Sequence, residues 1–181
     1  MLICLSGLPG TGKTTIAQEL ARGLSAVYLE VDRIELAMRS AGWPVEDEGY
    51  GVAQAVAEDN IRLGRTVVVD SVSPWPVTRR GWQAVAERTE VAIVEVEIVC
   101  TDLSEHRRRM SRRDISVEGG VSSWDRVVNC DYRAWDSPRL VVDTARMSVD
   151  RCVCAILERA FPGQPPVGNG SAVRPEGPPS G

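Results

Sequence analysis

The sequence predicts an α/β fold in which a parallel sheet is covered by helices on both faces, and three observations lead to it. Short apolar segments alternate with segments of helical periodicity through about residue 161. One apolar segment, residues 66–70, contains three consecutive valines without polar alternation, as expected of a strand covered on both faces. A glycine-rich stretch, residues 7–14, follows the first apolar segment and precedes the first helical one. This order of strand, loop and helix is typical of proteins that bind phosphate groups.

The elements of the first half are bounded by turn residues. Gly42 and Pro44 stop one predicted helix, and Gly64 closes another. Asp32 is predicted to end the second strand. In order, we expect a strand at 2–5, a helix from about 13 to 24, a strand at 27–32, helices at 33–41 and 50–63, and a strand at 66–70.

The second half continues the alternation of helices and strands. Asp102 or Ser104 can cap the first helix after the fourth strand, and Ser148 can cap the last one. In order, we expect a helix ending near 88, a strand at 91–100, a helix to about 113, a glycine-containing break at 115–121, a helix from 122 or 123 through 135, a strand at 139–143, and a helix to about 161. Parallel strands that alternate with helices favour a three-layer arrangement.

The 181 residues are expected to form one domain followed by a tail. Hydrophobic residues make up 43% and charged residues 25%, which is ordinary for a globular domain. Residues 162–181 contain six prolines and five glycines, so this segment cannot repay the entropy cost of ordering. We therefore expect a domain at residues 1–161 and a disordered tail at 162–181.

Net charge and hydropathy limit the classes of partner that this protein is expected to bind. The net charge of −4 gives no general attraction for nucleic acid, and no apolar run approaches the roughly 20 residues of a membrane span. The glycine-rich stretch begins before a signal peptide would end. We expect a cytoplasmic protein that binds neither membranes nor nucleic acid.

The glycine-rich stretch fits the phosphate-loop pattern G-x-x-x-x-G-K-[ST]. Glycines let backbone N–H groups converge on phosphate oxygens, and the following helix adds the positive end of its dipole. Lys13 is the only lysine among 21 cationic residues, which suggests selection for a compact ammonium at a phosphate. The candidate nucleotide-binding residues are Gly7, Leu8, Pro9, Gly10, Thr11, Gly12, Lys13, Thr14 and Thr15.

Three aspartates end predicted strands, at the edge of a parallel sheet where ligands bind. Asp70 is the candidate to hold Mg²⁺ together with the Thr14 hydroxyl. Asp32 is then the candidate general base for an acceptor hydroxyl, since the only histidine, His106, lies in a basic helix. The two aspartates can also exchange roles, and either can simply cap the helix that follows it. We assign Asp143 no role.

Residues 107–113 include five arginines. On a helix, Arg109 and Arg113 share a face. A basic helix followed by a glycine-bearing break is arranged like a lid, and a guanidinium brought onto the transferring phosphoryl group would stabilise the transition state. Arg109, Arg113 and Lys13 are therefore candidate catalytic residues. The alternatives are a solvated basic face or a nucleic-acid patch, and His106 is expected to be exposed.

Aromatic residues form two groups. Trp124, Tyr132 and Trp135 would share one side of the predicted helix, where they either pack in the core or wall a substrate pocket. The second group, Trp43, Trp75 and Trp82, falls together with Arg79 near the loops after Asp32 and Asp70, on the expected acceptor side.

With these residues in view, the chain resembles the small AAA-type P-loop kinases that include chloramphenicol phosphotransferase, the zeta toxins and the kinase domain of polynucleotide kinase. The segments that carry the resemblance are residues 7–14, 31–38, 64–70, 100–113, 124–135 and 142–145. The resemblance implies a five-stranded sheet ordered 2-3-1-4-5 and a helical lid with paired arginines. It also implies that Asp32 is the general base.

These observations lead to an expected function. We expect an ATP-dependent kinase that uses Mg²⁺ to move the γ-phosphoryl group to a hydroxyl of a small molecule. GTP is disfavoured as the donor because the guanine-reading pattern needs a lysine, and Lys13 is already engaged. The alternatives are a 5′-hydroxyl polynucleotide kinase, or a nucleotide-dependent switch protein without an acceptor.

Overall fold

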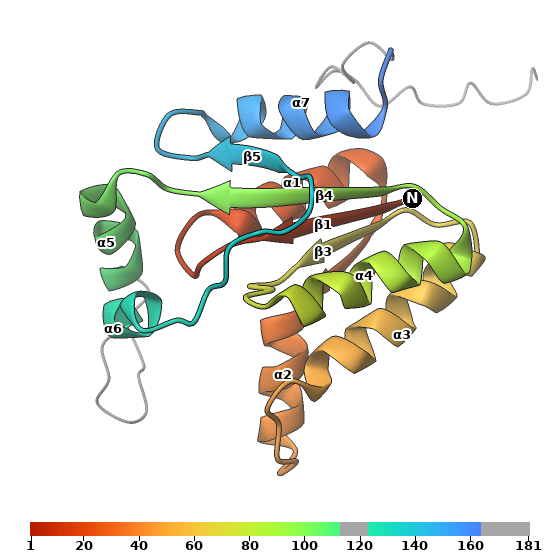
Figure 1. Cartoon of the computed structure of the whole chain (residues 1–181), viewed down its shortest axis with the longest axis horizontal. Coiled ribbons are helices and arrows are strands. Elements are labelled where there is room, and N and C mark those ends of the chain that lie inside the picture. Colours follow the sequence, from red (N-terminus) through yellow and green to blue (C-terminus); the bar gives the residue numbers. More distant parts are fainter. Residues whose placement is uncertain (113–122, 164–181) are drawn as a thin grey trace, which may run out of the picture.

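The computed structural model describes residues 1–112 and 123–163. Five parallel strands form one sheet with the order β2-β3-β1-β4-β5, which confirms the predicted α/β class and strand order. All five strands point toward the end of the molecule where α5 (Leu103–Ser111) and α6 (Ser123–Val128) lie (Figure 1). The strands are β1 (Leu2–Ser6), β2 (Val27–Glu30), β3 (Val67–Asp70), β4 (Ile93–Val99) and β5 (Leu140–Asp143).

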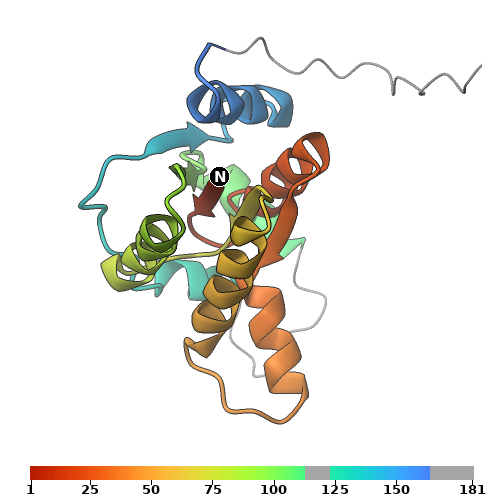
Figure 2. The same cartoon turned by 90° about the vertical axis from the view of Figure 1, so that its right-hand side faces the viewer.

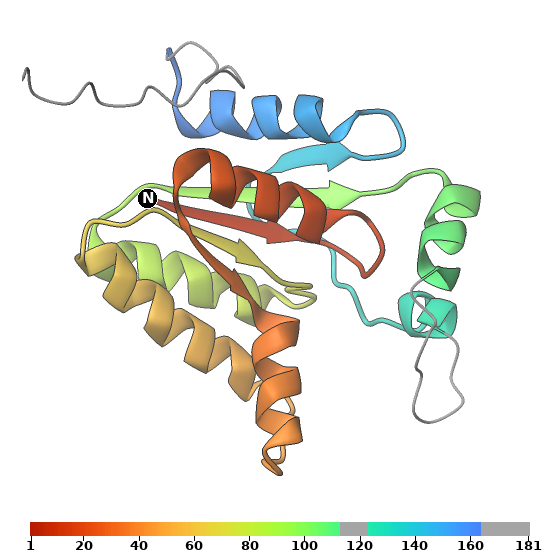
Figure 3. The ribbon, with the colours of Figure 1, turned by 180° about the vertical axis from the view of Figure 1, so that it is seen from behind.

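Helices cover both faces of the sheet, because successive residues of a strand point to opposite faces. Ile3 and Leu5 pack with α1 and α7, whereas Leu2 and Cys4 pack with α3 and α4. Figure 3 shows α1 lying across the sheet with α7 beside it, and Figure 2 shows α2 alongside α3. The helices are α1 (Lys13–Leu24), α2 (Val31–Ser40), α3 (Glu48–Arg62), α4 (Pro76–Thr89), α5 (Leu103–Ser111), α6 (Ser123–Val128) and α7 (Val149–Ala160).

Two predicted boundaries are wrong. The second strand ends at Glu30, so Asp32 lies in the first turn of α2 rather than at a strand end. The helix predicted through Trp135 ends at Val128. Tyr132 and Trp135 lie in the irregular segment before β5 because their rings pack against a guanidinium of another element, that of Arg79. Tertiary contacts therefore override the helical spacing of these aromatics.

Other expectations fall outside the described residues. Arg113 and the glycine-containing break at 115–121 lie in the gap at 113–122, and residues 164–181 of the expected tail are likewise outside. Within the described ranges, no helix is long and apolar enough to cross a membrane.

Candidate functional site

The glycine-rich loop connects β1 to α1 at the carboxyl edge of the sheet. Its glycines have positive φ angles, including 139° at Gly7 and 81° at Gly10. A Cβ atom at Gly7 would lie 2.2 Å from the backbone oxygen of Ile98, and one at Gly10 would lie 2.4 Å from Sδ of Met110. A side chain at Gly7 would collide with the backbone of β4, whereas one at Gly10 would meet the end of the flexible Met110 side chain. Packing therefore requires glycine at position 7, in addition to what phosphate chemistry requires.

Lys13 begins α1 and is almost entirely buried. Its Nζ donates a hydrogen bond of 2.9 Å to the carbonyl oxygen of Leu8, so the ammonium lies across the loop. Thr11 Oγ1 donates to the same oxygen at 2.9 Å. Thr14 is half-buried and Thr15 is exposed, both in the first turn of α1. The loop thus places its single ammonium and the N-terminus of a twelve-residue helix at one point, which suits an anionic phosphate chain.

Helix α5 supports the loop from outside. His106 is only 4% exposed, and its Nε2 lies 2.7 Å from the carbonyl oxygen of Pro9. A carbonyl only accepts, so Nε2 carries the proton. The rings of His106 and Trp124 of α6 are nearly perpendicular, with an interplanar angle of 86° and 5.3 Å between their centroids. The expectation of an exposed His106 is wrong, because sequence periodicity could not reveal that the phosphate loop lies against α5.

Arg109 reaches from α5 to the turn that follows β5. Its Nη1 donates to Thr144 Oγ1 at 2.8 Å, and its Nη2 donates to the Thr144 carbonyl at 3.1 Å. Glu105 holds the other side of the guanidinium through a 2.8 Å ion pair. Arg109, followed by Arg108, holds the pKa of the Glu105 carboxyl below its usual range. Thr144 Oγ1 lies 2.7 Å from the carbonyl oxygen of Thr11, which links the phosphate loop to the loop after β5.

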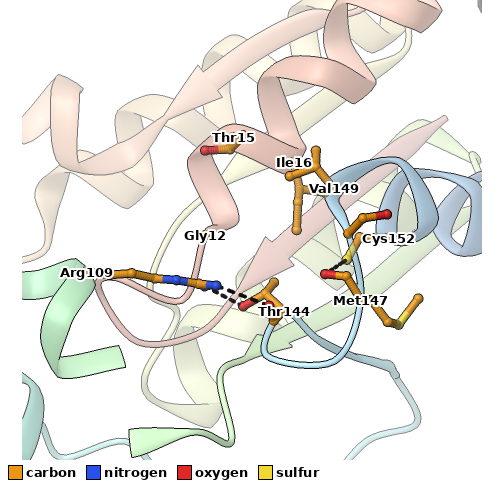
Figure 4. Close-up of a pocket in the computed structure, with 9 residues that line it drawn as sticks. Gly12, Thr15, Ile16, Arg109, Thr144, Met147, Val149 and Cys152 are labelled. Carbon is orange, nitrogen blue, oxygen red and sulfur yellow. Dashed lines mark hydrogen bonds between the residues drawn. The ribbon is translucent and has the colours of Figure 1, made fainter. Parts of the chain in front are cut away.

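A pocket of about 340 Å³ lies beside this guanidinium (Figure 4). It opens between the start of α1 and the turn that connects β5 to α7, with Arg109 along one side (Figure 4). Its lining combines a planar cation with several apolar groups, a combination that suits a flat heteroaromatic ring. The lining residues are Gly12, Thr15, Ile16, Arg109, Thr144, Met147, Ser148, Val149 and Cys152.

Asp70 ends β3 and is buried next to β1, where it is in register with Leu5. The Tyr28 hydroxyl lies 3.2 Å from Asp70 Oδ2 and 3.1 Å from a Glu30 carboxylate oxygen. Burial, followed by the charges of Asp70 and Glu30, raises the pKa of Tyr28. The phenol therefore stays protonated, and it can donate to only one of the two carboxylates at a time.

The oxygen atoms of side chains near the phosphate loop are suitable ligands for a magnesium ion. Among the described residues no group of three or more His, Cys, Asp or Glu side chains is placed to hold a metal on its own. Mg²⁺ prefers oxygen ligands and usually takes one or two from protein, the rest coming from phosphates and water. The Asp70 carboxylate and the Thr14 hydroxyl are ligands of this kind, so the residues present suit a cation that arrives with a nucleotide.

Asp32 lies in different surroundings, in the first turn of α2. Its side chain is exposed, and its charge acts on Tyr50 of α3. Burial first, and then the negative charge of Asp32, raises the pKa of Tyr50. The Tyr50 hydroxyl accepts a 2.9 Å hydrogen bond from the backbone N–H of Ser73, in the loop after β3. The structure thus associates Asp32 with the β3–α4 loop, and Arg109 with the β5–α7 turn on the other side of the phosphate loop.

Asp143, which was assigned no role from its sequence context, connects two loops by hydrogen bonds. Its carboxylate accepts from Thr101 N at 3.1 Å, Thr101 Oγ1 at 2.5 Å and Ala145 N at 3.0 Å. Burial alone would raise the pKa of Asp143, but these hydrogen bonds and nearby Arg146 hold it below its usual value. Sequence reasoning missed His106, Glu105 and Thr144. Only Thr144 had a signal, as the residue after an aspartate at the end of a strand.

Comparison with known proteins places the chain in a family. Residues 2–123 match the AAA domain family. No curated protein matches the sequence. The fold is similar to that of the Mycobacterium tuberculosis APS kinase, solved in complex with AMPPNP and APS, with a TM-score of 0.65, 19% identity, and 87% of this chain and 95% of that chain covered.

Two further solved structures share the fold. A putative kinase from Chloroflexus aurantiacus aligns with a TM-score of 0.65 and 18% identity over 90% of this chain and 97% of that chain. A gluconokinase from Sinorhizobium meliloti aligns with a TM-score of 0.61 and 18% identity over 87% of this chain and 91% of that chain. At these identities the likeness is one of fold.

Proposed function

Because this chain belongs to the AAA domain family, we propose that it is an ATP-dependent kinase that phosphorylates a hydroxyl of a small molecule. The observation that carries the proposal is the phosphate loop, with Lys13 buried across it and a pocket beside its end. The similarity of fold to an APS kinase and a gluconokinase supports a kinase over other nucleotide-binding functions. The expected cytoplasmic location and the absence of a nucleic-acid partner stay predictions.

The loop and α1 would bind the triphosphate. Backbone N–H groups of residues 7–14 and the N-terminus of α1 present donors to the phosphate oxygens. Lys13 would exchange its hydrogen bond to the Leu8 carbonyl for the β- and γ-phosphates. Thr14 and Asp70 would hold Mg²⁺, which when bound neutralises phosphate charge.

The pocket beside Arg109 would take the base of the nucleotide. The guanidinium is held by Glu105 and Thr144, so its plane is fixed before a ligand arrives. A fixed planar cation stacks on an aromatic ring at low entropic cost. This position beside the pocket favours a contact with the nucleoside over one with the γ-phosphoryl group. The alternative, a catalytic Arg109 that acts on the γ-phosphoryl group, is separated from this role by the kinetics of Arg109→Ala.

In the proposed reaction the acceptor oxygen forms a bond to the γ-phosphorus as the bond to the leaving ADP oxygen breaks. The acceptor proton passes to a carboxylate. Asp32 is our candidate because it is exposed at the start of α2, near the β3–α4 loop. Asp70 is buried and hydrogen-bonded to Tyr28, which suits a metal ligand better than a base.

The proposal can be tested by following the label of γ-labelled ATP in a panel of hydroxyl compounds, with Mg²⁺ present. Transfer to one class of small molecule, absent in Lys13→Ala, is the expected result. Label that appears only on the 5′ end of an oligonucleotide would favour a polynucleotide kinase. Release of labelled inorganic phosphate alone, at a rate that no compound changes, would overturn the proposal in favour of an ATPase.

A further inference from the structure

A strained residue lies in the loop between β3 and α4. Ser73 is completely buried and has a φ of 43°, in the left-handed region that non-glycine residues seldom occupy. Such a conformation persists only where the surroundings fix it. The Tyr50 hydroxyl accepts from the Ser73 N–H at 2.9 Å, Arg79 Nε donates to its carbonyl at 3.0 Å, and the Ser71 hydroxyl meets its Oγ at 2.8 Å.

Arg79, in the first turns of α4, has an unusual environment for a cation. It is 2% exposed, and among the described residues no carboxylate lies within ion-pair distance of it, although its charge acts on Glu95 from further away. Its guanidinium instead donates to four backbone carbonyl oxygens, which compensate for the loss of water. These carbonyls belong to Ser73 at 3.0 Å, Pro74 at 3.1 Å, Arg133 at 2.7 Å and Ala134 at 3.1 Å.

Those four carbonyls come from two separate segments. Ser73 and Pro74 belong to the β3–α4 loop, whereas residues 133 and 134 belong to the segment that runs from α6 to β5. The rings of Trp135 and Tyr132 also stack on the guanidinium, at 4.3 and 5.1 Å from its carbon. Arg79 is therefore a single buried cross-link between a loop of the sheet edge and the segment that returns from the α5–α6 region.

The two joined segments lie beside the phosphate loop. The Arg133 N–H donates to the Pro74 carbonyl at 2.8 Å, and Trp75 Nε1 donates to Asp131 at 3.2 Å. The β3–α4 loop also contacts the phosphate loop, because the Gly7 N–H donates to the Val72 carbonyl at 3.2 Å. Residues 71–75 and 131–135 are thus joined to each other by hydrogen bonds, and the first of these two segments is also bonded to the first residue of the phosphate loop. We call these two segments together the acceptor wall.

We propose that Arg79 is a positioning residue that holds the acceptor wall together, so that an acceptor is bound in line with the phosphate loop. The acceptor role of the wall rests on the proposed function, while the cross-link itself does not. An arginine is required because only a guanidinium has donors in a fork wide enough to reach both segments. Lysine keeps the charge, but its three donors share one nitrogen and are too few for four carbonyl oxygens spread over two segments.

The test compares Arg79→Met and Arg79→Lys with a matched control, Arg80→Met. Arg80 is the next residue, but its side chain is 64% exposed and its ion pair with Asp136 is loose, at 3.6 Å. Amide hydrogen exchange of full-length protein without ligand reports the cross-link directly. We expect the Ser73 and Arg133 amides to exchange at least about tenfold faster in both Arg79 variants, and at the wild-type rate in Arg80→Met.

Kinetics then test the role of the wall with the acceptor that the labelling screen identifies. We expect kcat/KM for that acceptor to fall at least about tenfold in Arg79→Lys, with KM for ATP within about twofold of wild type. Unchanged amide exchange in Arg79→Lys would overturn the cross-link. Faster exchange with an unchanged acceptor kcat/KM would overturn the positioning role.

A further variant and the result of the labelling screen distinguish a failure of the cross-link from a failure to fold or a failure of the proposed function. If Arg79→Met fails to fold, Arg79→Lys and Tyr50→Phe remain as tests. Tyr50→Phe removes the hydroxyl that accepts from Ser73 N, so it should accelerate exchange at Ser73 and leave the Arg133 amide protected. If wild-type protein transfers label to no compound, the proposed kinase function fails, and amide exchange still decides whether Arg79 holds the two segments together.

Discussion

His106 Nε2 donates a 2.7 Å hydrogen bond to the carbonyl oxygen of Pro9, which joins α5 to the middle of the phosphate loop. The two residues are 97 positions apart in the chain. Met110 lies one turn further along α5 and packs against Gly10. The basic helix therefore does more than carry arginines, because its buried face fixes the backbone on which phosphate would bind.

Replacing His106 by leucine should loosen the loop. The Pro9 carbonyl would lose a buried donor, which costs about 1–2 kcal/mol of unfolding free energy. ATP binding, measured by calorimetry, should weaken because the loop amides are less well ordered. His106→Gln, whose side-chain amide can donate from a similar position, is the matched control and should retain most of both quantities. Wild-type stability and affinity in His106→Leu would contradict the supporting role of α5.

Lys13→Met should abolish phosphoryl transfer. Removing a charge aimed at the transferring group typically costs at least about 100-fold in rate. Lys13→Arg should be nearly as slow, since a planar guanidinium does not fit where the buried ammonium lies across the Leu8 carbonyl. Single-turnover transfer from γ-labelled ATP measures both. Substantial activity in either variant would show that the loop binds phosphate without needing this ammonium.

Asp32→Asn and Asp70→Asn should have different effects. Loss of a general base lowers kcat by about 10²–10⁴, so Asp32→Asn should be slow at every Mg²⁺ concentration while still binding ATP. Asp70→Asn should instead raise the Mg²⁺ concentration needed for half-maximal rate. A Mg²⁺ titration of transfer rate separates them, and the reverse pattern would mean that the two aspartates have exchanged roles.

Arg109→Ala should raise KM for ATP about tenfold and change kcat little, because the guanidinium lies beside the pocket at the end of the loop. Arg108→Ala is the control, since Arg108 also pairs with Glu105 but its side chain is 54% exposed. Steady-state kinetics with ATP as the varied substrate give both constants. A large fall in kcat with unchanged KM would instead support the catalytic role that the sequence suggested for Arg109.

Asp143→Asn should destabilise the fold in a pH-dependent way. The hydrogen bonds from Thr101 and Ala145 hold the folded-state pKa of Asp143 below its unfolded value, despite the opposing effect of burial. A lowered pKa contributes stability above the unfolded pKa of about 4, and that stability is lost as pH falls through the folded pKa. Chemical denaturation should show that the unfolding free energy of Asp143→Asn is about 1 kcal/mol lower than that of the wild type at pH 7. This difference should shrink below pH 4. A pH-independent difference would contradict this.

Much of the phosphate site could be predicted from local sequence. The spacing of residues 7–14 and the apolar segments around it depend on neighbours along the chain, so they identify the loop, β1 and α1 without tertiary information. The order of the strands came from the resemblance to a kinase group and is confirmed. The predicted ends of β2 and α6 were wrong, because contacts with distant elements determine where these two elements end.

What the sequence by itself determined is the phosphate loop, with Lys13 at its centre, and the strand–helix alternation that places aspartates at one edge of a sheet. Only the tertiary structure decided that His106 is buried against Pro9, that Arg109 lies along the pocket near Thr144, and that Arg79 joins two segments. The physical reason is the range of the interactions. Backbone conformation and amphipathic periodicity act over a few residues, whereas a buried imidazole or guanidinium finds its carbonyl partners only after distant segments have packed together.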